Sequence, residues 1–154
     1  MSSSKPAAKD ALATSTLRYA RVGVRSTRDV LTYLERRGAS PNTAARILAD
    51  CQALGLLDDR AAARLWADQW ARRGYASAAI RLKLQAKGFD ARVSDEAAAR
   101  VGPASDDEAR ARFVVTSVLR RQSSRPGRAQ RLARVLASRG FDPELIERVL
   151  AHPQ

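Results

Sequence analysis

Apolar residues recur along the chain three and four positions apart, which is the period of helices that bury one face. Pairs of large apolar residues four apart stand at Val30 and Leu34, Ile80 and Leu84, and Leu132 and Leu136. The chain has no long apolar alternation with a period of two, and its commonest residues, Ala, Leu and Arg, favour helices. The pattern therefore predicts an all-α fold.

The same pattern occurs three times. A basic residue followed by Gly ends each copy, at Arg37-Gly38, Lys87-Gly88 and Arg139-Gly140, and the spacings are 50 and 52 residues. In each copy the Gly comes four residues after the second apolar residue of the pair. Each copy therefore has one buried stripe on a helix that closes with a basic residue and a glycine.

The whole chain divides into three tandem units of three helices each, near residues 12–55, 58–101 and 105–152. One unit is too small to bury its own stripe, so we expect the units to stack into an elongated, curved array within a single repeat domain, 12–152. Residues 1–11 are expected to be a disordered N-terminal tail.

Polar residues predict where several helices begin. Ser40-Pro41 and Asp142-Pro143 each place a capping side chain before a proline at the first helical position. Asp58-Asp59 and Asp106-Asp107 open the corresponding helices of successive units, where carboxylates can accept from free N–H groups. We favour this capping role over a metal or acid/base site.

Composition excludes several classes of protein. The 154 residues carry a net charge of +12, and 24 of the 28 basic residues are Arg, so a polyanionic partner is expected. No uncharged stretch approaches the ~20 residues that a bilayer span needs, and no secretory leader is apparent at the start. The single Cys51 has apolar neighbours, which indicates a buried thiol and a cytoplasmic location.

Residues for catalysis are scarce. His152 is the only histidine, and no glycine-rich loop for phosphate is encoded. No catalytic, cofactor-binding or metal-binding residue is assigned, and the chain is not expected to be an enzyme.

The arginines are more informative. Residues 109–141 contain nine arginines and no acid, and residues 60–89 contain seven basic residues against Asp68 alone. Solvated helix faces normally mix charges of both signs, so we favour contact with a polyanion, mainly with phosphates. Trp66 and Trp70 lie four apart, which favours packing over base stacking. The predicted contact residues are Arg72, Arg73, Arg81, Lys83, Lys87, Arg120, Arg121, Arg125, Arg128, Arg131 and Arg139.

Several segments together resemble the RecX family, whose members regulate the bacterial RecA recombinase. The resemblance covers about residues 14–151, and it is carried by Leu54-Gly-Leu-Leu-Asp-Asp59, Arg72-Arg-Gly-Tyr75, Ile80-Arg-Leu-Lys-Leu84, Lys87-Gly-Phe89 and Leu136-Ala-Ser-Arg-Gly-Phe-Asp-Pro-Glu-Leu-Ile146. The chain departs from the family pattern at Ala76, where Gly is usual, at Ala79, where Arg is usual, and at Lys83, where Glu is usual.

The resemblance implies a fold of three tandem three-helix repeats and no catalysis. It also implies binding in the groove of the RecA–single-stranded DNA filament, with inhibition of filament extension, ATP hydrolysis and strand exchange. Single-stranded DNA, and also duplex DNA, would be contacted through phosphates, and a monomer is expected. A direct DNA-binding protein of the helix-turn-helix type is the alternative, although Pro41-Asn42 and Pro143-Glu144 make poor starts for a recognition helix. A generic helical-repeat adaptor is a third hypothesis.

Overall fold

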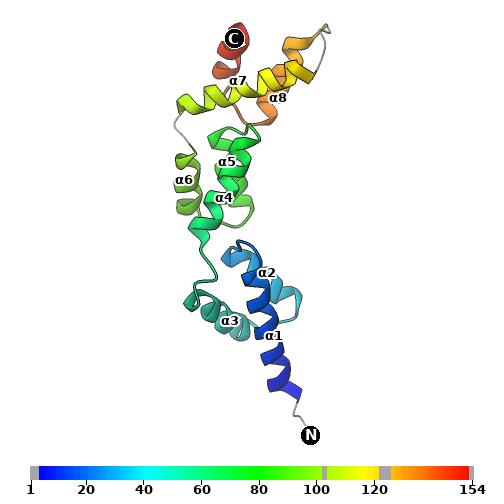
Figure 1. Cartoon of the computed structure of the whole chain (residues 1–154), viewed down its shortest axis with the longest axis vertical. Coiled ribbons are helices and arrows are strands. Elements are labelled where there is room, and N and C mark those ends of the chain that lie inside the picture. Colours follow the sequence, from blue (N-terminus) through cyan, green and yellow to red (C-terminus); the bar gives the residue numbers. More distant parts are fainter. Residues whose placement is uncertain (1–3, 102–103, 122–125, 153–154) are drawn as a thin grey trace. The chain divides into compact units, whose positions relative to one another are not determined.

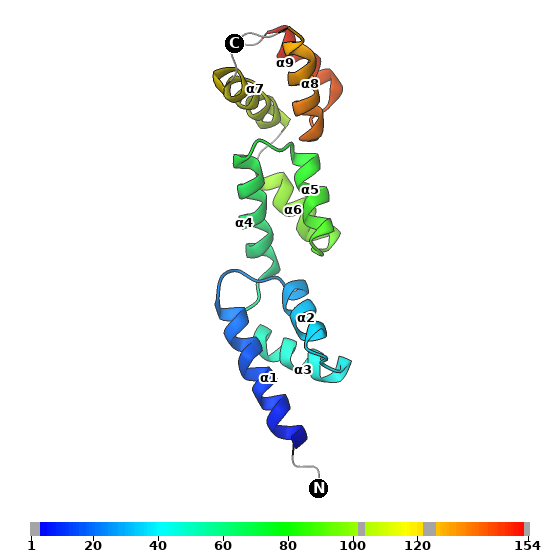
Figure 2. The ribbon, with the colours of Figure 1, turned by 90° about the vertical axis from the view of Figure 1, so that its right-hand side faces the viewer.

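A computed structural model describes residues 4–101, 104–121 and 126–152, and this part of the chain contains nine helices and no strand (Figures 1 and 2). The helices are α1 (Ser4–Arg21), α2 (Thr27–Arg36), α3 (Pro41–Ala53), α4 (Asp59–Arg72), α5 (Ser77–Ala86), α6 (Ala91–Arg100), α7 (Ala104–Arg121), α8 (Arg128–Ser138) and α9 (Pro143–Ala151). The predicted all-α fold is confirmed. The chain forms two compact units, residues 1–63 and 64–154.

In the first unit, α1, α2 and α3 pack against one another around a small core (Figure 2). Val30 and Leu34 of α2 are completely buried there, together with Ile47 and Cys51 of α3. The two residues on each helix lie four apart, so they share one face, and Val30 and Leu34 form the stripe that the sequence predicts.

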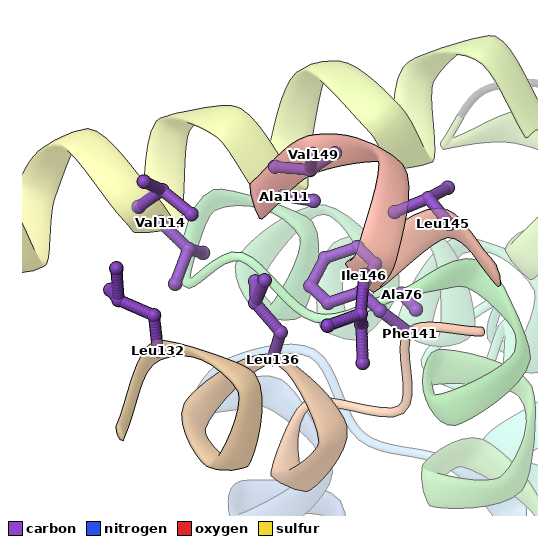
Figure 3. Close-up of a cluster of buried hydrophobic side chains, with 10 residues drawn as sticks. Ala76, Ala111, Val114, Leu132, Leu136, Phe141, Leu145, Ile146 and Val149 are labelled. Carbon is purple, nitrogen blue, oxygen red and sulfur yellow. The ribbon is translucent and has the colours of Figure 1, made fainter. Parts of the chain in front are cut away.

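The last three helices enclose a buried cluster in the second unit. Leu132 and Leu136 of α8 face Val114 of α7, and Phe141 lies beneath Val149 of α9 (Figure 3). Ala76, the residue before α5, is buried in the same cluster although it belongs to the preceding repeat. The cluster therefore joins the second repeat to the third.

The middle repeat has a thinner core. α5 packs along α6, and the fully buried Ile80 and Leu84 of α5 are the counterparts of the stripe residues in the other repeats. On α6 the buried positions are small, Ala97 and Ala98. Small residues bury less apolar area, and we expect this repeat to depend more on its neighbours.

The same hydrogen bonds end the second helix of each repeat. Leu34, Leu84 and Leu136 each accept a hydrogen bond from the residue after the glycine, over 3.1, 3.2 and 3.3 Å. Each glycine N–H also bonds the carbonyl three residues before it, which completes a Schellman motif. The basic residue before the glycine is the C-cap in all three, as predicted.

The start of the chain differs from the prediction. Residues 1–11 were expected to be a disordered tail, but α1 begins at Ser4. Alanines at positions 7, 8 and 11 are strong helix formers, so the α1 helix continues towards the N-terminus beyond its packed part. Residues 1–3 lie outside the described part of the chain.

The paired carboxylates whose side chains the structure describes cap helices, and of these Asp58 caps its own helix, whereas Asp59 and Asp107 cap another. Asp58 accepts from the N–H of Ala61, 3.0 Å away, at the start of α4. Asp59 instead accepts from the N–H of Thr27, 2.6 Å away, at the start of α2. Asp107 of α7 likewise accepts from the N–H of Ser77, 3.0 Å away, at the start of α5. The first turn of one repeat thus caps the second helix of the repeat before it.

The succession of helices agrees with three repeats of three helices each. The single domain spanning 12–152 and the curved array stay predictions.

Candidate nucleic-acid interface

Four of the predicted contact residues line one open groove in the second unit. Arg72 and Arg73 come from the end of α4, Arg121 from the end of α7, and Arg139 from the C-cap of α8. The groove has a volume of about 410 Å³, and its floor and rim include Tyr75, Phe113, Val114, Ser117 and Val118. No acidic residue among the described ones lines it. Three separate elements therefore contribute four arginines to this groove, which we call the arginine groove.

Close backbone contacts position these arginines. The N–H of Ala76 donates to the carbonyl of Arg139 over 3.0 Å, and the guanidinium of Arg139 donates to the carbonyl of Arg73. Gly74 lies so close to Val114 that a Cβ on Gly74 would clash with the valine side chain. Gly74 also has a φ of +80°, which side chains other than glycine rarely adopt. The end of α4 is thus fixed against α7 and α8.

Arg139 has a structural role that the sequence did not reveal. Its side chain is half-buried, bonds the end of α4 and lies 5.8 Å from the ring centroid of Tyr75. A positive charge near the last carbonyls of a helix, here those of α4, also interacts favourably with the negative end of the helix dipole. Contact between Arg139 and a polyanion stays a prediction.

Two arginines of the stretch without acids are neutralised by residues just before it. Arg110 pairs with Asp107 and also donates to the carbonyl of Val101 over 2.6 Å. Arg112 donates to Glu108 over 2.7 Å. These pairs are three and four residues apart on one helix, a spacing that was visible in the sequence. Arg110 and Arg112 hold the fold together and were not among the predicted contacts.

Glu108 links two helices of the last repeat. It accepts from Arg112 within α7 and from Arg148 of α9, which lies 3.3 Å away. The hydrogen bond from Arg112 and the positive charges of Arg148 and Arg112 lower the pKa of the Glu108 carboxyl. This carboxylate is therefore charged at neutral pH and belongs to the packing of α7 against α9.

Lys83 and Lys87, both predicted contacts, lie over aromatic rings. The Nζ of Lys83 is 4.5 Å from the ring centroid of Tyr75, and the Nζ of Lys87 is 3.8 Å from that of Trp66. Trp70 is buried, which confirms the expected packing role, whereas Trp66 is half-buried. Cation–π contacts at such distances stabilise the pairing of α4 with α5.

The first unit has a related arrangement, which the sequence analysis missed. The rings of Tyr19 and Tyr33 stack with centroids 4.3 Å apart, and Arg25 and Arg37 lie over them at 4.3 and 4.2 Å. Tyr33 stands five residues before Gly38, as Lys83 does before Gly88, and Arg37 matches Lys87. The repeat register was thus a signal for this cluster.

The remaining predicted contacts are spread over the second unit. Arg81 is exposed and lies 3.8 Å from Asp95, while Arg120 and Arg128 are exposed at the end of α7 and the start of α8. Arg131 is half-buried. Arg125 lies outside the described residues. The lining of the arginine groove includes none of Arg81, Arg120, Arg128 and Arg131.

Two further kinds of feature, a metal centre and a membrane-spanning helix, are absent from the part of the chain that the structure describes. No group of three or more His, Cys, Asp or Glu residues is placed to hold a metal ion there. None of the described helices combines the length and apolar character that crossing a membrane requires.

Comparison with known proteins shows the family. A regulatory protein RecX from Mycolicibacterium smegmatis is 31% identical over 140 residues, which cover 84% of this chain and 72% of that protein. One from Mycobacterium leprae is 35% identical over 121 residues, covering 73% of this chain and 68% of that protein. The chain belongs to the RecX family. No family model matches it.

The fold is similar to that of RecX proteins of known structure. RecX from Lactobacillus salivarius superimposes with a TM-score of 0.76 over 94% of this chain and 96% of that one, at 16% sequence identity. At this identity the similarity concerns the fold alone. The curated RecX relatives are named regulatory proteins, and membership of this family supports a regulatory role.

Two of the three departures from the RecX pattern, Ala76 and Ala79, lie where the second and third repeats meet. Ala76 is buried in the cluster of the third repeat, and Ala79 lies against Gly140, where an added Cβ would stand 2.5 Å from that of Ala79. Small residues at both positions permit this approach. Lys83 is the third departure, and its ammonium group makes cation–π contacts with the rings of Tyr75 and Trp70.

Proposed function

We propose that this chain is a non-catalytic regulator that binds the RecA–single-stranded DNA filament and inhibits its extension, ATP hydrolysis and strand exchange. Membership of the RecX family carries the proposal, because the relatives are named regulatory proteins. The arginine groove and the net charge of +12 support it from the chain's own chemistry.

A protein–DNA filament suits a cationic partner of this kind. DNA phosphates attract guanidinium groups, which can hold two phosphate oxygens at once. Arg72, Arg73 and Arg121 stand together without a carboxylate in the groove lining, so a phosphate could pair with them. The proposed action is therefore binding that hinders movement or growth of the filament, with no reaction on this chain.

The decisive measurement is the rate of ATP hydrolysis by RecA on single-stranded DNA, with the chain added at a stoichiometric amount after the filament has formed. We expect the rate to fall, because a protein bound in the filament hinders the cycle of its subunits. Changing Arg72, Arg73 and Arg121 together to Ala should weaken this effect. Arg100→Ala is the matched control, since Arg100 is exposed in the last turn of α6 and lies outside the groove.

An unchanged rate of hydrolysis with the wild-type chain would overturn the proposal. A second experiment adds the chain to the DNA before RecA, in order to detect simple coverage of free DNA. A protein that only covers free DNA would lower the rate of hydrolysis in this order of addition and would have no effect on a preformed filament. Sequence-specific duplex binding without RecA would favour the helix-turn-helix alternative.

A further inference from the structure

We propose that the arginine groove holds one nucleotide of a single strand, with its phosphate on Arg72, Arg73 and Arg121 and its base against the ring of Phe113. The inference rests on the proposed function in taking nucleic acid as the ligand. It goes further because the sequence favoured contact with phosphates and assigned no ring to base stacking.

The charges in the groove favour an anionic ligand. The guanidinium groups of Arg72, Arg73 and Arg121 form no ion pair within the described part of the chain. Like charges repel one another in a concave site more strongly than on an open surface, because low-dielectric walls focus their field. Arginine holds phosphate through two parallel N–H bonds, and a cluster of arginines without carboxylates is the usual setting for that contact.

Phe113 supplies the second half of the site. It is 60% exposed, although it lies directly beside the buried Val114 and on the rim of the arginine groove. Bases stack on such rings regardless of their identity, because every base has a π face. Ser117, one turn further along α7, adds a hydroxyl that can donate to a phosphate or to a base edge.

The size of the groove favours a single strand over a duplex. A volume of about 410 Å³ lies at the lower end of the range for small-ligand pockets, so the groove has room for one nucleotide but not for a base pair with both of its strands. A base must also leave its own stack to meet Phe113, which a single strand permits. An acidic peptide would satisfy the arginines but would have no use for the exposed ring.

The test is the affinity of the purified chain for a fluorescent oligothymidylate, measured by anisotropy without RecA. We expect Phe113→Ala to weaken binding about ten-fold, which corresponds to about 1.4 kcal/mol and lies within the range for one stacked base. Phe113→Tyr keeps the ring and should bind almost as the wild type does. Leu65→Ala is the control, because Leu65 is a 53% exposed apolar residue of α4 outside the groove.

The phosphate half has its own measurement. Arg121→Ala should reduce the salt dependence of binding, with the slope of log affinity against log salt falling by about 0.7 for one lost phosphate contact to a single strand. Arg100→Ala should change the slope less, since Arg100 does not line the groove. A sugar-phosphate oligomer without bases cannot stack on the ring of Phe113, so it should bind the wild-type chain and the Phe113→Ala variant with the same affinity.

Three results would overturn the inference. The first is an equal loss of affinity for Phe113→Ala and Leu65→Ala, and the second is an equal change of the salt slope for Arg121→Ala and Arg100→Ala. The third is that polyglutamate competes for the groove and that Phe113→Ala weakens its binding as much as it weakens the binding of oligothymidylate. The outcome is separate from that of the filament assay. A chain that inhibits RecA while Phe113→Ala binds DNA normally would refute this inference alone. A chain that binds oligothymidylate in this groove but leaves RecA unaffected would refute the proposed function alone.

Discussion

Cys51 is completely buried in the core formed by α1, α2 and α3. Burial, and to a lesser degree the negative charge of Asp50, raises the pKa of its thiol. Because the thiolate is the reactive form, we expect a water-soluble disulfide reagent at pH 8 to leave the folded chain unmodified. The same reagent should modify one thiol per chain in concentrated urea. Rapid modification of the folded chain would show that this core opens readily.

Burial of single residues was the most predictable property. The stripe residues Leu34, Leu84 and Leu136 are all completely buried, because helical periodicity decides which side of a helix faces the core. The partners of charged side chains were less predictable. The bond from Arg139 to the carbonyl of Arg73 joins residues 66 positions apart, and no local pattern encodes such a contact.

At the scale of elements, Asp59 and Asp107 complete the first turns of α2 and α5. Replacing either by Ala leaves a helical N–H without its partner, and we expect a loss of about 1 kcal/mol in the free energy of unfolding. Asp107→Ala should cost more than Asp59→Ala, because the mostly buried Arg110 would also lose its carboxylate. Denaturation in urea, followed by circular dichroism, measures both.

Asp68→Ala is the matched control for these variants. Asp68 is exposed in the middle of α4, so its replacement by Ala changes helix propensity without removing a cap. Variants of Asp59 and Asp107 that are as stable as the Asp68 variant would contradict a capping role.

Helix ends were predictable where their signals are local. Ser40 and Asp142 cap the helices that follow them, each with proline at the first helical position, because cap and helix are adjacent in sequence. The sequence also indicated that Asp59 and Asp107 cap helices, but it did not indicate which ones. Their partners lie 32 and 30 residues earlier, so only the folded repeat brings them together.

For the whole molecule, the net charge of +12 predicts how salt affects stability. The free chain carries an excess of positive charge in either half of its sequence, and mutual repulsion opposes its compact state. Salt screens this repulsion, so we expect Tm to rise when NaCl is increased from about 20 to 300 mM, over which the screening length falls well below ~20 Å. A falling Tm would show instead that ion pairs such as Arg112–Glu108 dominate.

The arginine groove could not have been predicted as a site, although four of its residues were named from the sequence. Arg72 and Arg73, Arg121, and Arg139 come from three elements, and only tertiary packing brings them together. The charge pattern identified the kind of residue and the second and third repeats as the part of the chain that carries it. Phe113 was missed, since an apolar residue at helical spacing ordinarily indicates a core position.

The capping of one repeat by the next gives the chain a direction. A ribosome makes the protein from its N-terminus, so α2 is complete only after Asp59 has emerged, and α5 only after Asp107 has emerged. The helix α8 begins at Arg128, and its N-cap Gly127 provides no side-chain cap. The second helix of each of the first two repeats thus receives a cap from the repeat that follows, and a nascent chain stopped before Asp59 or Asp107 would leave an N–H at the start of that helix without its partner.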